Sequence, residues 1–181
     1  MSQITVAVVV GSIRKDSYNK QFAEALTKQF PADVKAKFIR IDDLPLYNQD
    51  DDGNPTAAVT RLREEIKAAD AVLFVTPEYN RSVPGVLKNA MDHASRPWGQ
   101  SVWTGKPAGV IGVSPGAPGT SMAQQHLRNV VSYLNMPQLS QPEMFIQWKD
   151  GLVENGAIGA ASKEFVQKYV DAFVAWVKQH A

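Results

Sequence analysis

The chain has 181 residues, enough to bury the core of one domain, and we expect a single domain over residues 1–181. Its 19 Lys and Arg nearly balance its 18 Asp and Glu, which argues against a nucleic-acid-binding or membrane-surface protein. The absence of cysteine excludes disulfides, thiolate metal sites and cysteine nucleophiles. There is no secretory signal pattern and no apolar run of the roughly 18 residues that a membrane span needs, so we expect a cytoplasmic protein.

Apolar runs alternate with segments of helical spacing along the chain. Runs typical of strands lie at 4–10, 34–41, 71–75, 108–113 and, more weakly, near 143–146. The segment 45–55 is an acidic, turn-rich connection. Apolar residues three or four positions apart predict the helices, and they are Phe22, Leu26 and Phe30, closed by Pro31; Val59, Leu62 and Ile66; Leu87, Ala90, Met91 and Ala94; Leu127, Val130, Val131 and Leu134; and Phe165, Val166, Tyr169, Val170, Phe173, Val174 and Val177.

This alternation predicts an α/β fold with a parallel sheet and helices on both faces. Five such strands commonly form a doubly wound sheet of order 2-1-3-4-5. The 34–41 run alternates apolar and charged residues, which places it at an edge. Ligands bind beyond the carboxyl ends of the strands where the order reverses, between strands one and three. The loops after Val10 and Val75 are therefore the candidate site.

The first of these loops, Gly11 to Lys20, is rich in hydroxyl and amide side chains and leads into a helix. Main-chain N–H groups at a helix N-terminus point outward and carry partial positive charge, so this loop is a candidate phosphate site. It contains neither G-x-x-x-x-G-K-[ST] nor G-x-G-x-x-G. The phosphate is therefore not assigned by either of the common glycine-rich motifs.

The second loop, Thr76 to Gly85, contains prolines that restrict its backbone, with polar and aromatic residues between them. A stiff loop can present amides and carbonyls to a flat heteroaromatic edge at little entropic cost. A third loop, Ser114 to Ser121, follows the fourth strand, and its glycines allow a close approach to a ligand. Pro115 and Pro118 remove amide donors from that loop.

Two separated motifs, the second followed directly by a helical stretch, resemble the NAD(P)H-dependent FMN reductase family, and within it the chromate- and quinone-reducing branch. The motifs are Gly11-Ser12-x-Arg14-x-x-Ser17-x-Asn19 and Pro77-Glu78-Tyr79-Asn80-x-Ser82-x-Pro84-Gly85, and the helical stretch is Leu87-Lys88-Asn89-Ala90. The resemblance covers essentially the whole chain and implies a flavodoxin-like fold.

The resemblance also implies which residues bind FMN. Those expected to hold the phosphate are Ser12, Arg14, Ser17 and Asn19. Those expected to line the ribityl chain and the isoalloxazine edge are Pro77, Glu78, Tyr79 and Asn80, with Ser114 from the third loop. The types fit, because a phosphate dianion is bound by a guanidinium, hydroxyls, amides and a helix terminus.

The implied activity is ping-pong reduction. NADPH or NADH reduces bound FMN and leaves, and a quinone, free flavin, azo dye or chromate then accepts the electrons at the same place. The flavin N5 carries the chemistry, so no catalytic side chain is expected. The family likeness further implies a homodimer or homotetramer in which a neighbouring subunit walls the flavin pocket.

Two other functions remain open. A flavodoxin-type electron carrier would share the fold, but such carriers are typically strongly acidic, whereas this chain has a formal charge of +1. A flavin-free binding or regulatory module is the third reading, since a fold alone does not give a function.

Several residues also have simpler interpretations. Ser17 and Asn19 suit helix N-caps, Arg14 a solvated charge, and the Glu78 side chain a cap or surface carboxylate. Lys88 and Asn89 suit a helix surface or interface more than direct ligation. Trp98 and Trp103 suit packing in the core or between subunits more than stacking on the nicotinamide. His93, His126 and His180 lack metal-ligand spacing, so no metal is expected. Arg81 is either a solvated arginine or a residue at the pocket mouth that attracts the 2′-phosphate of NADPH or an anionic acceptor.

Overall fold

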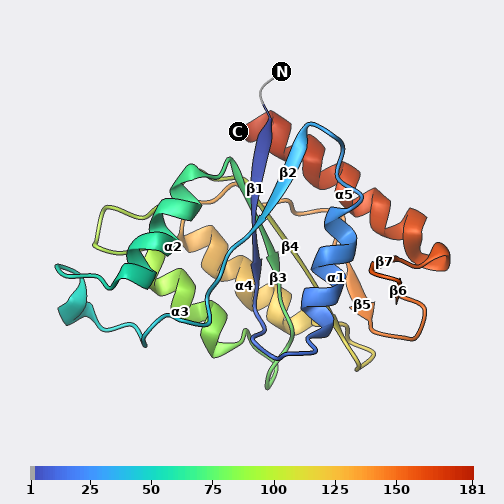
Figure 1. Cartoon of the computed structure of the whole chain (residues 1–181), viewed down its shortest axis with the longest axis horizontal. Coiled ribbons are helices and arrows are strands. Elements are labelled where there is room, and N and C mark those ends of the chain that lie inside the picture. The colour runs from blue at the N-terminus through green and yellow to red at the C-terminus, as the bar shows by residue number, and fades with distance from the viewer. Residues whose placement is uncertain (1–2) are drawn as a thin grey trace.

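A computed structural model describes residues 3–181 and contains a five-stranded parallel sheet in the order β2-β1-β3-β4-β5. The strands are β1 (Ile4–Val10), β2 (Val34–Phe38), β3 (Ala71–Val75), β4 (Ala108–Ser114) and β5 (Phe145–Gln147). Helices lie on both sides of the sheet (Figure 1). The predicted doubly wound α/β architecture and strand order are therefore confirmed.

The helices form two layers. α1 (Tyr18–Thr27) and α5 (Ala160–His180) cover one face, and α2 (Ala57–Ala68), α3 (Gly85–Ala94) and α4 (Ser121–Tyr133) cover the other. The sequence of strand β1 is nearly all apolar because both of its faces are covered. Val6 and Val8 pack into the core under α1 and α5, whereas Ala7 and Val9 pack into the core under the other three helices.

Strand β2 lies at the edge of the sheet, as predicted, but it ends at Phe38 rather than at residue 41. Ile39 donates its N–H to Val8 O at 2.9 Å, and beyond it the chain leaves the ladder. Ile39 and Ile41 still pack into the core under α2 and α3. The alternation of apolar residues past Phe38 therefore reflects the burial of Ile39 and Ile41 and not a longer strand.

Two other predicted boundaries are wrong by a few residues. α1 ends at Thr27, so Phe30 lies outside it, and the chain closes through turn bonds such as Phe30 N–H to Thr27 O at 3.2 Å. The last strand of the sheet, expected near 143–146, runs from Phe145 to Gln147. The helical spacing of apolar residues continues past the end of α1 because Phe30 packs against the same core as Phe22 and Leu26.

The region before α5 contains a small hairpin that the sequence analysis missed, β6 (Val153–Glu154) and β7 (Ala157–Ile158). Its turn residues Asn155 and Gly156 both have positive φ, at 51° and 71°. α5 is also longer than its apolar stripe, and Phe165 is half-exposed and not on its buried face. Within residues 3–181, no helix combines the length and the apolar character needed to cross a bilayer.

Candidate functional site

The first and second loops begin side by side at the carboxyl ends of β1 and β3. Val10 is in register with Val75, and Gly11 N–H donates to Val75 O at 2.9 Å. A Cβ on Gly11 would lie 3.3 Å from Pro77 Cδ and 3.1 Å from Leu87 Cδ2. The missing side chain therefore lets the two loops approach closely, as the switch point between strands one and three requires.

The first loop presents a set of hydrogen-bond donors at the start of α1. Ser17 is the N-cap, and its Oγ accepts the Lys20 N–H at 3.2 Å. The main-chain N–H groups of Tyr18 and Asn19 have no hydrogen-bond partner among residues 3–181. Together with the hydroxyls of Ser12 and Ser17, these N–H groups form a donor set suited to a phosphate.

Asn19 has a different role from the one expected for its side chain. Its Nδ2 donates to Val113 O at 2.9 Å, and its Oδ1 accepts the Val113 N–H at 2.9 Å. The residue is 3% exposed. The carboxamide thus joins the start of α1 to strand β4, and the main-chain N–H of Asn19 has no partner among residues 3–181. We therefore expect the main-chain N–H of Asn19, more than its side chain, to meet a phosphate.

Arg14 lies over the aromatic ring of Tyr18, with Cζ 4.8 Å from the ring centroid. Its Nη2 donates to the carbonyl of Asp16, within the same loop. A cleft of about 400 Å³ opens beside this loop, between the ends of β1 and β2, and Ser12, Arg14 and Lys20 line it. The guanidinium is thus held at the edge of an open space that also adjoins a serine hydroxyl.

The second loop contains a tight hairpin turn. Tyr79 and Ser82 exchange two main-chain hydrogen bonds, at 3.1 and 3.0 Å. Between them Asn80 and Arg81 both have positive φ, at 50° and 65°, the pattern of a type I′ turn. The Tyr79 side chain is 50% exposed at the base of this turn, and Arg81 projects from its tip into solvent.

Glu78 connects the second loop to the N-terminus of α4. Its Oε2 accepts the N–H groups of Met122 at 3.0 Å and Ala123 at 3.1 Å. The N-cap residue Thr120 makes no side-chain cap bond, so Glu78 performs that role from a distant part of the chain. The simpler interpretation of this side chain, a helix cap, is therefore the one that the structure shows. The Glu78 main chain remains the candidate for a ligand.

Two weaker contacts also involve the turn, the first to α4 and the second within the loop itself. Ser82 Oγ lies 3.0 Å from His126 Nδ1. Arg81 Nη1 lies 3.8 Å from Glu78 Oε1, with the arginine side chain 68% exposed. The loop is thus fixed at Glu78 and Ser82, on either side of the turn.

Ser114 ends β4 and begins the third loop. Its Oγ donates to Gly116 O at 3.1 Å, and its carbonyl accepts the Trp148 N–H at 2.8 Å. Two residues earlier, a Cβ on Gly112 would lie 2.0 Å from the carbonyl oxygen of Thr76, at the start of the second loop. The third loop therefore starts beside the second, and Ser114 lies at the same sheet edge as the other candidate residues.

Other residues singled out in the sequence have structural contacts. Asn89 accepts the Tyr47 N–H and donates to Pro45 O, both at 2.8 Å, and so holds the connection after β2. Lys88 pairs with Asp92 at 2.9 Å. Trp103 is fully buried, whereas Trp98 is 76% exposed. Over residues 3–181, no three His, Asp or Glu side chains gather in a way that could hold a metal ion.

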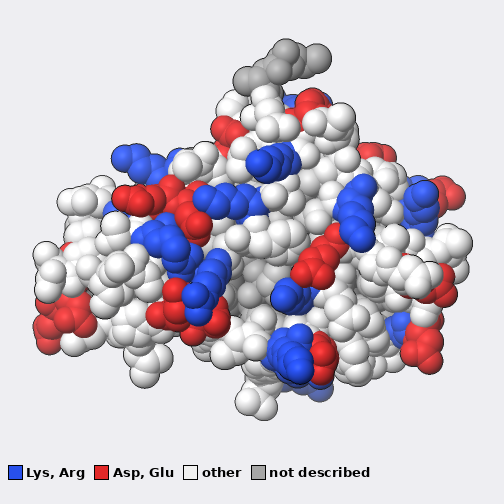
Figure 2. Space-filling model, viewed as in Figure 1, with Lys and Arg blue, Asp and Glu red and all other residues white. Residues whose placement is uncertain are grey.

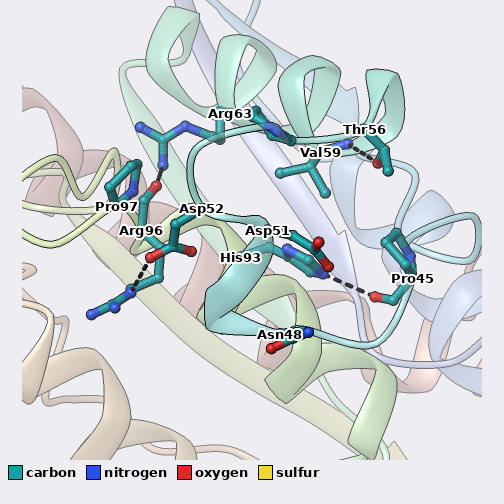
Figure 3. Close-up of a pocket in the computed structure, with 11 residues that line it drawn as sticks. Pro45, Asn48, Asp51, Asp52, Thr56, Val59, Arg63, His93, Arg96 and Pro97 are labelled. Atoms are coloured by element: carbon teal, nitrogen blue, oxygen red, sulfur yellow. Dashed lines mark hydrogen bonds and ion pairs between the residues drawn. The ribbon is translucent and has the colours of Figure 1, made fainter.

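A separate small cavity lies between α2, α3 and the 45–55 connection (Figure 3). Its volume is about 50 Å³, and His93 Nε2 donates to Pro45 O at 2.9 Å on one side of it. Small-molecule pockets are roughly 300–1,000 Å³. This cavity is too small for a nucleotide-sized ligand and is lined by none of the predicted site residues.

The face of the molecule in Figure 2 carries basic and acidic side chains in alternation, without a broad field of either sign. This agrees with the formal charge of +1. A protein that docks other proteins by electrostatic steering usually has such a field. This face therefore offers no strongly charged docking field for a protein partner.

Comparison with known proteins decides the family. The model of the NADPH-dependent FMN reductase family matches residues 4–149, which include all three loops. The chain belongs to this family. Members of the NADPH-dependent FMN reductase family are oxidoreductases, so the predictions of an enzyme that uses FMN and a nicotinamide cofactor are confirmed at the level of the family.

Two similar relatives are quinone reductases by name. A quinone reductase from Pseudomonas putida is 50% identical over 181 residues, with 98% of this chain and 97% of the relative covered. A 2-hydroxy-1,4-benzoquinone reductase from a Burkholderia species is 49% identical over 177 residues, with 97% of each chain covered. A solved structure of FerB, a flavoenzyme NAD(P)H:(acceptor) oxidoreductase from Paracoccus denitrificans, is 44% identical with a TM-score of 0.94 and 98% of each chain covered.

Proposed function

We propose that this FMN reductase family member oxidises NADPH or NADH with bound FMN and passes the electrons to a quinone. The observation that carries the proposal is the meeting of two loops at the switch point of the sheet. One presents phosphate-type donors at a helix N-terminus, and the other is a stiff loop with a half-exposed aromatic side chain. The names of the two quinone reductase relatives support the choice of acceptor.

The residues present fit an FMN phosphate. Arg14 supplies a positive charge, Ser12 and Ser17 supply hydroxyls, and the unpartnered N–H groups of Tyr18 and Asn19 complete the donor set. All of these groups belong to one short segment, residues 12–19, that leads into α1. We assign the phosphate to this loop.

The flavin ring is assigned to the second and third loops. Main-chain groups of Pro77, Glu78, Tyr79 and Asn80 would lie along its edge, and Ser114 would adjoin it from β4. Because Glu78 and Ser82 fasten the second loop to α4, its main-chain groups are held in place before the ring binds. The rigid loop orients the ring, and its anchors take no part in the chemistry.

FMN, when bound, accepts a hydride from the nicotinamide and gives electrons to the acceptor. The chain's own contribution is to hold the phosphate, orient the ring and leave one side of the ring open to substrate. We propose that both substrates use this open side in turn, in a ping-pong scheme. Because an open site makes few specific contacts with the acceptor, free flavin, azo dyes or chromate could be reduced besides quinones.

We also propose that the protein acts as a homodimer or homotetramer. Large apolar side chains near the first and second loops are exposed in the single chain, with Ile13 at 63% and Tyr79 at 50%. A second copy placed over them would bury this apolar surface and close one wall of the flavin pocket. Sedimentation of the FMN-loaded protein tests the assembly.

Steady-state kinetics test the proposed activity. Purified chain with FMN should oxidise NADPH or NADH when a benzoquinone is present, with no partner reductase added. Double-reciprocal plots at several quinone concentrations should give parallel lines, the signature of ping-pong kinetics. A protein that binds FMN but oxidises no NAD(P)H would be an electron carrier, and intersecting lines would contradict the shared binding place.

The role of Arg81 is testable in the same assay. If its guanidinium attracts the 2′-phosphate of NADPH, Arg81→Ala lowers kcat/KM for NADPH and leaves kcat/KM for NADH unchanged, whereas Arg81→Lys retains most of the preference. If it attracts an anionic acceptor instead, the loss falls on that acceptor alone. An unchanged NADPH/NADH ratio together with an unchanged acceptor profile would identify Arg81 as a solvated arginine.

A further inference from the structure

Three side chains from two distant parts of the chain form a continuous stack beside the first loop. The Arg14 guanidinium lies 4.8 Å from the Tyr18 ring centroid. The other neighbour of the Tyr18 ring is Trp148, with ring centroids 4.5 Å apart and an angle of 24° between the planes. Both distances are within the range of favourable cation–π and aromatic contacts.

Trp148 is itself fixed to the third loop. Its main-chain N–H donates to Ser114 O at 2.8 Å, and the neighbouring Gln147 donates from Nε2 to Pro115 O at 2.9 Å. Tyr18 and Trp148 also pack, partly buried, against the core under α1 and α5. The aromatic pair is therefore a firm support that links the first loop to the third, and Arg14 is its exposed end.

We propose that Tyr18 and Trp148 are positioning residues that hold the Arg14 guanidinium ready for a phosphate, and that they thereby set the preference for FMN over riboflavin. The proposal rests on the proposed function, because it assumes that the first loop binds the flavin phosphate. A free arginine side chain loses much rotamer freedom when it binds an anion. An arginine already held on a ring, with one N–H committed to Asp16, loses less.

The charges around the guanidinium support this role. Arg14 has no ion-pair partner among residues 3–181, since its recorded contacts are a carbonyl and a ring face. The nearby Lys20 is 4.0 Å from Glu24 and is partly neutralised by it. Lys15, which lines the same cleft, lies over no aromatic ring of residues 3–181. Arg14 is thus the cation of this loop that is both oriented and not paired with a carboxylate.

The test compares the affinities of apoprotein variants for FMN and for riboflavin, which differ only in the phosphate. By isothermal titration, Tyr18→Leu should weaken FMN binding roughly three- to ten-fold and leave riboflavin binding within about two-fold. Tyr18→Phe keeps the ring and should behave as the wild type. Trp148→Leu should show a smaller loss of the same kind, and it serves as the second variant if Tyr18→Leu does not fold.

The decisive measurement is the coupling between the Tyr18 and Arg14 substitutions. In an Arg14→Ala background, Tyr18→Leu should cause no further loss of FMN affinity, because the aromatic ring acts only through the guanidinium. Equal weakening of FMN and riboflavin by Tyr18→Leu, or an undiminished effect in the Arg14→Ala background, would overturn the positioning role while leaving the proposed function intact. A wild-type chain that binds neither flavin would overturn the proposed function and this proposal with it.

Discussion

At the scale of single residues, the candidate site depends on side chains that hydrogen-bond to the main chain of a distant segment. Asn19 lies in the first turn of α1, at the end of the candidate phosphate loop. Its carboxamide nevertheless pairs with both main-chain groups of Val113 in β4. The pairing fixes the start of α1 against the sheet, and so it fixes where the free N–H groups of the first loop point. We propose that the residue contributes to the candidate phosphate site mainly by holding it in place.

Asn19→Ala should therefore destabilise the apoprotein. The change leaves a buried N–H and a buried C=O of Val113 without partners, which we expect to lower the free energy of unfolding by about 2–4 kcal/mol. Urea denaturation of the FMN-free protein measures this. Lys20→Ala, one residue along the same helix but exposed, is the matched control and should change the free energy of unfolding by no more than about 0.5 kcal/mol.

At the scale of elements, two long-range contacts join segments that are far apart in sequence. Glu78 caps α4 from a position 44 residues before Met122. At the other end of the molecule, Lys178 in α5 binds the carboxylate of Asp33, just before β2, at 2.6 Å. The first contact fixes the second loop, and the second fastens the C-terminal helix to the edge of the sheet.

Glu78→Ala should remove the cap of α4 and loosen the second loop. The loss of a nearly buried carboxylate at a helix N-terminus should cost roughly 0.5–2 kcal/mol of stability and weaken FMN and riboflavin binding alike, because the effect falls on the ring end of the flavin. Arg81→Ala removes only the exposed partner of Glu78 and should cost less than about 0.5 kcal/mol. Equal losses in the two variants would contradict the capping role.

The Asp33–Lys178 contact predicts a pH dependence. The hydrogen bond from Lys178 holds the pKa of Asp33 below its ordinary value of 3.8. A carboxyl whose pKa is lower in the folded state stabilises the fold at pH values above the ordinary pKa, and this stabilisation is lost as the pH falls through the lowered value. The contribution should therefore be complete near neutral pH and fade below 3.8.

Thermal unfolding of Asp33→Asn tests the sign of this effect. The variant should melt below the wild type at about pH 6, and the gap should shrink towards about pH 2. Asp171→Asn is the control on α5, because the recorded partner of that carboxylate is the Gln167 amide at 2.7 Å and not a cation. A gap that stays constant from neutral to acidic pH would show that the ion pair does not contribute in this way.

At the scale of the whole molecule, the fold and the meeting of the two candidate loops could be predicted from local patterns. Apolar runs and helical spacing predict alternating strands and helices, for which 2-1-3-4-5 is a common strand order. This order, which the structure has, places the loops after Val10 and Val75 at one sheet edge. The hairpin at Asn155-Gly156 was also readable, since this dipeptide is a strong signal for a two-residue turn.

The contacts that make the site specific could not be predicted in the same way. Asn19 and Val113 are 94 residues apart, and Tyr18 meets Trp148 only because β5 lies beside β4. Nothing local in the sequence distinguishes an asparagine that binds a ligand from one that binds a strand. The predicted length of β2 was wrong for a related reason, because Ile39 and Ile41 are buried by packing although they lie beyond the last residue of the strand.

The central claim is that the chain binds FMN at these loops and reduces it directly with a nicotinamide cofactor. The most direct measurement is the visible spectrum of the purified chain, loaded with FMN and mixed with NADPH under anaerobic conditions. The flavin band should bleach promptly without any other protein, and a stoichiometric benzoquinone should restore it. A chain that takes up no FMN, or whose bound FMN keeps its oxidised spectrum when NADPH is added, would contradict the account.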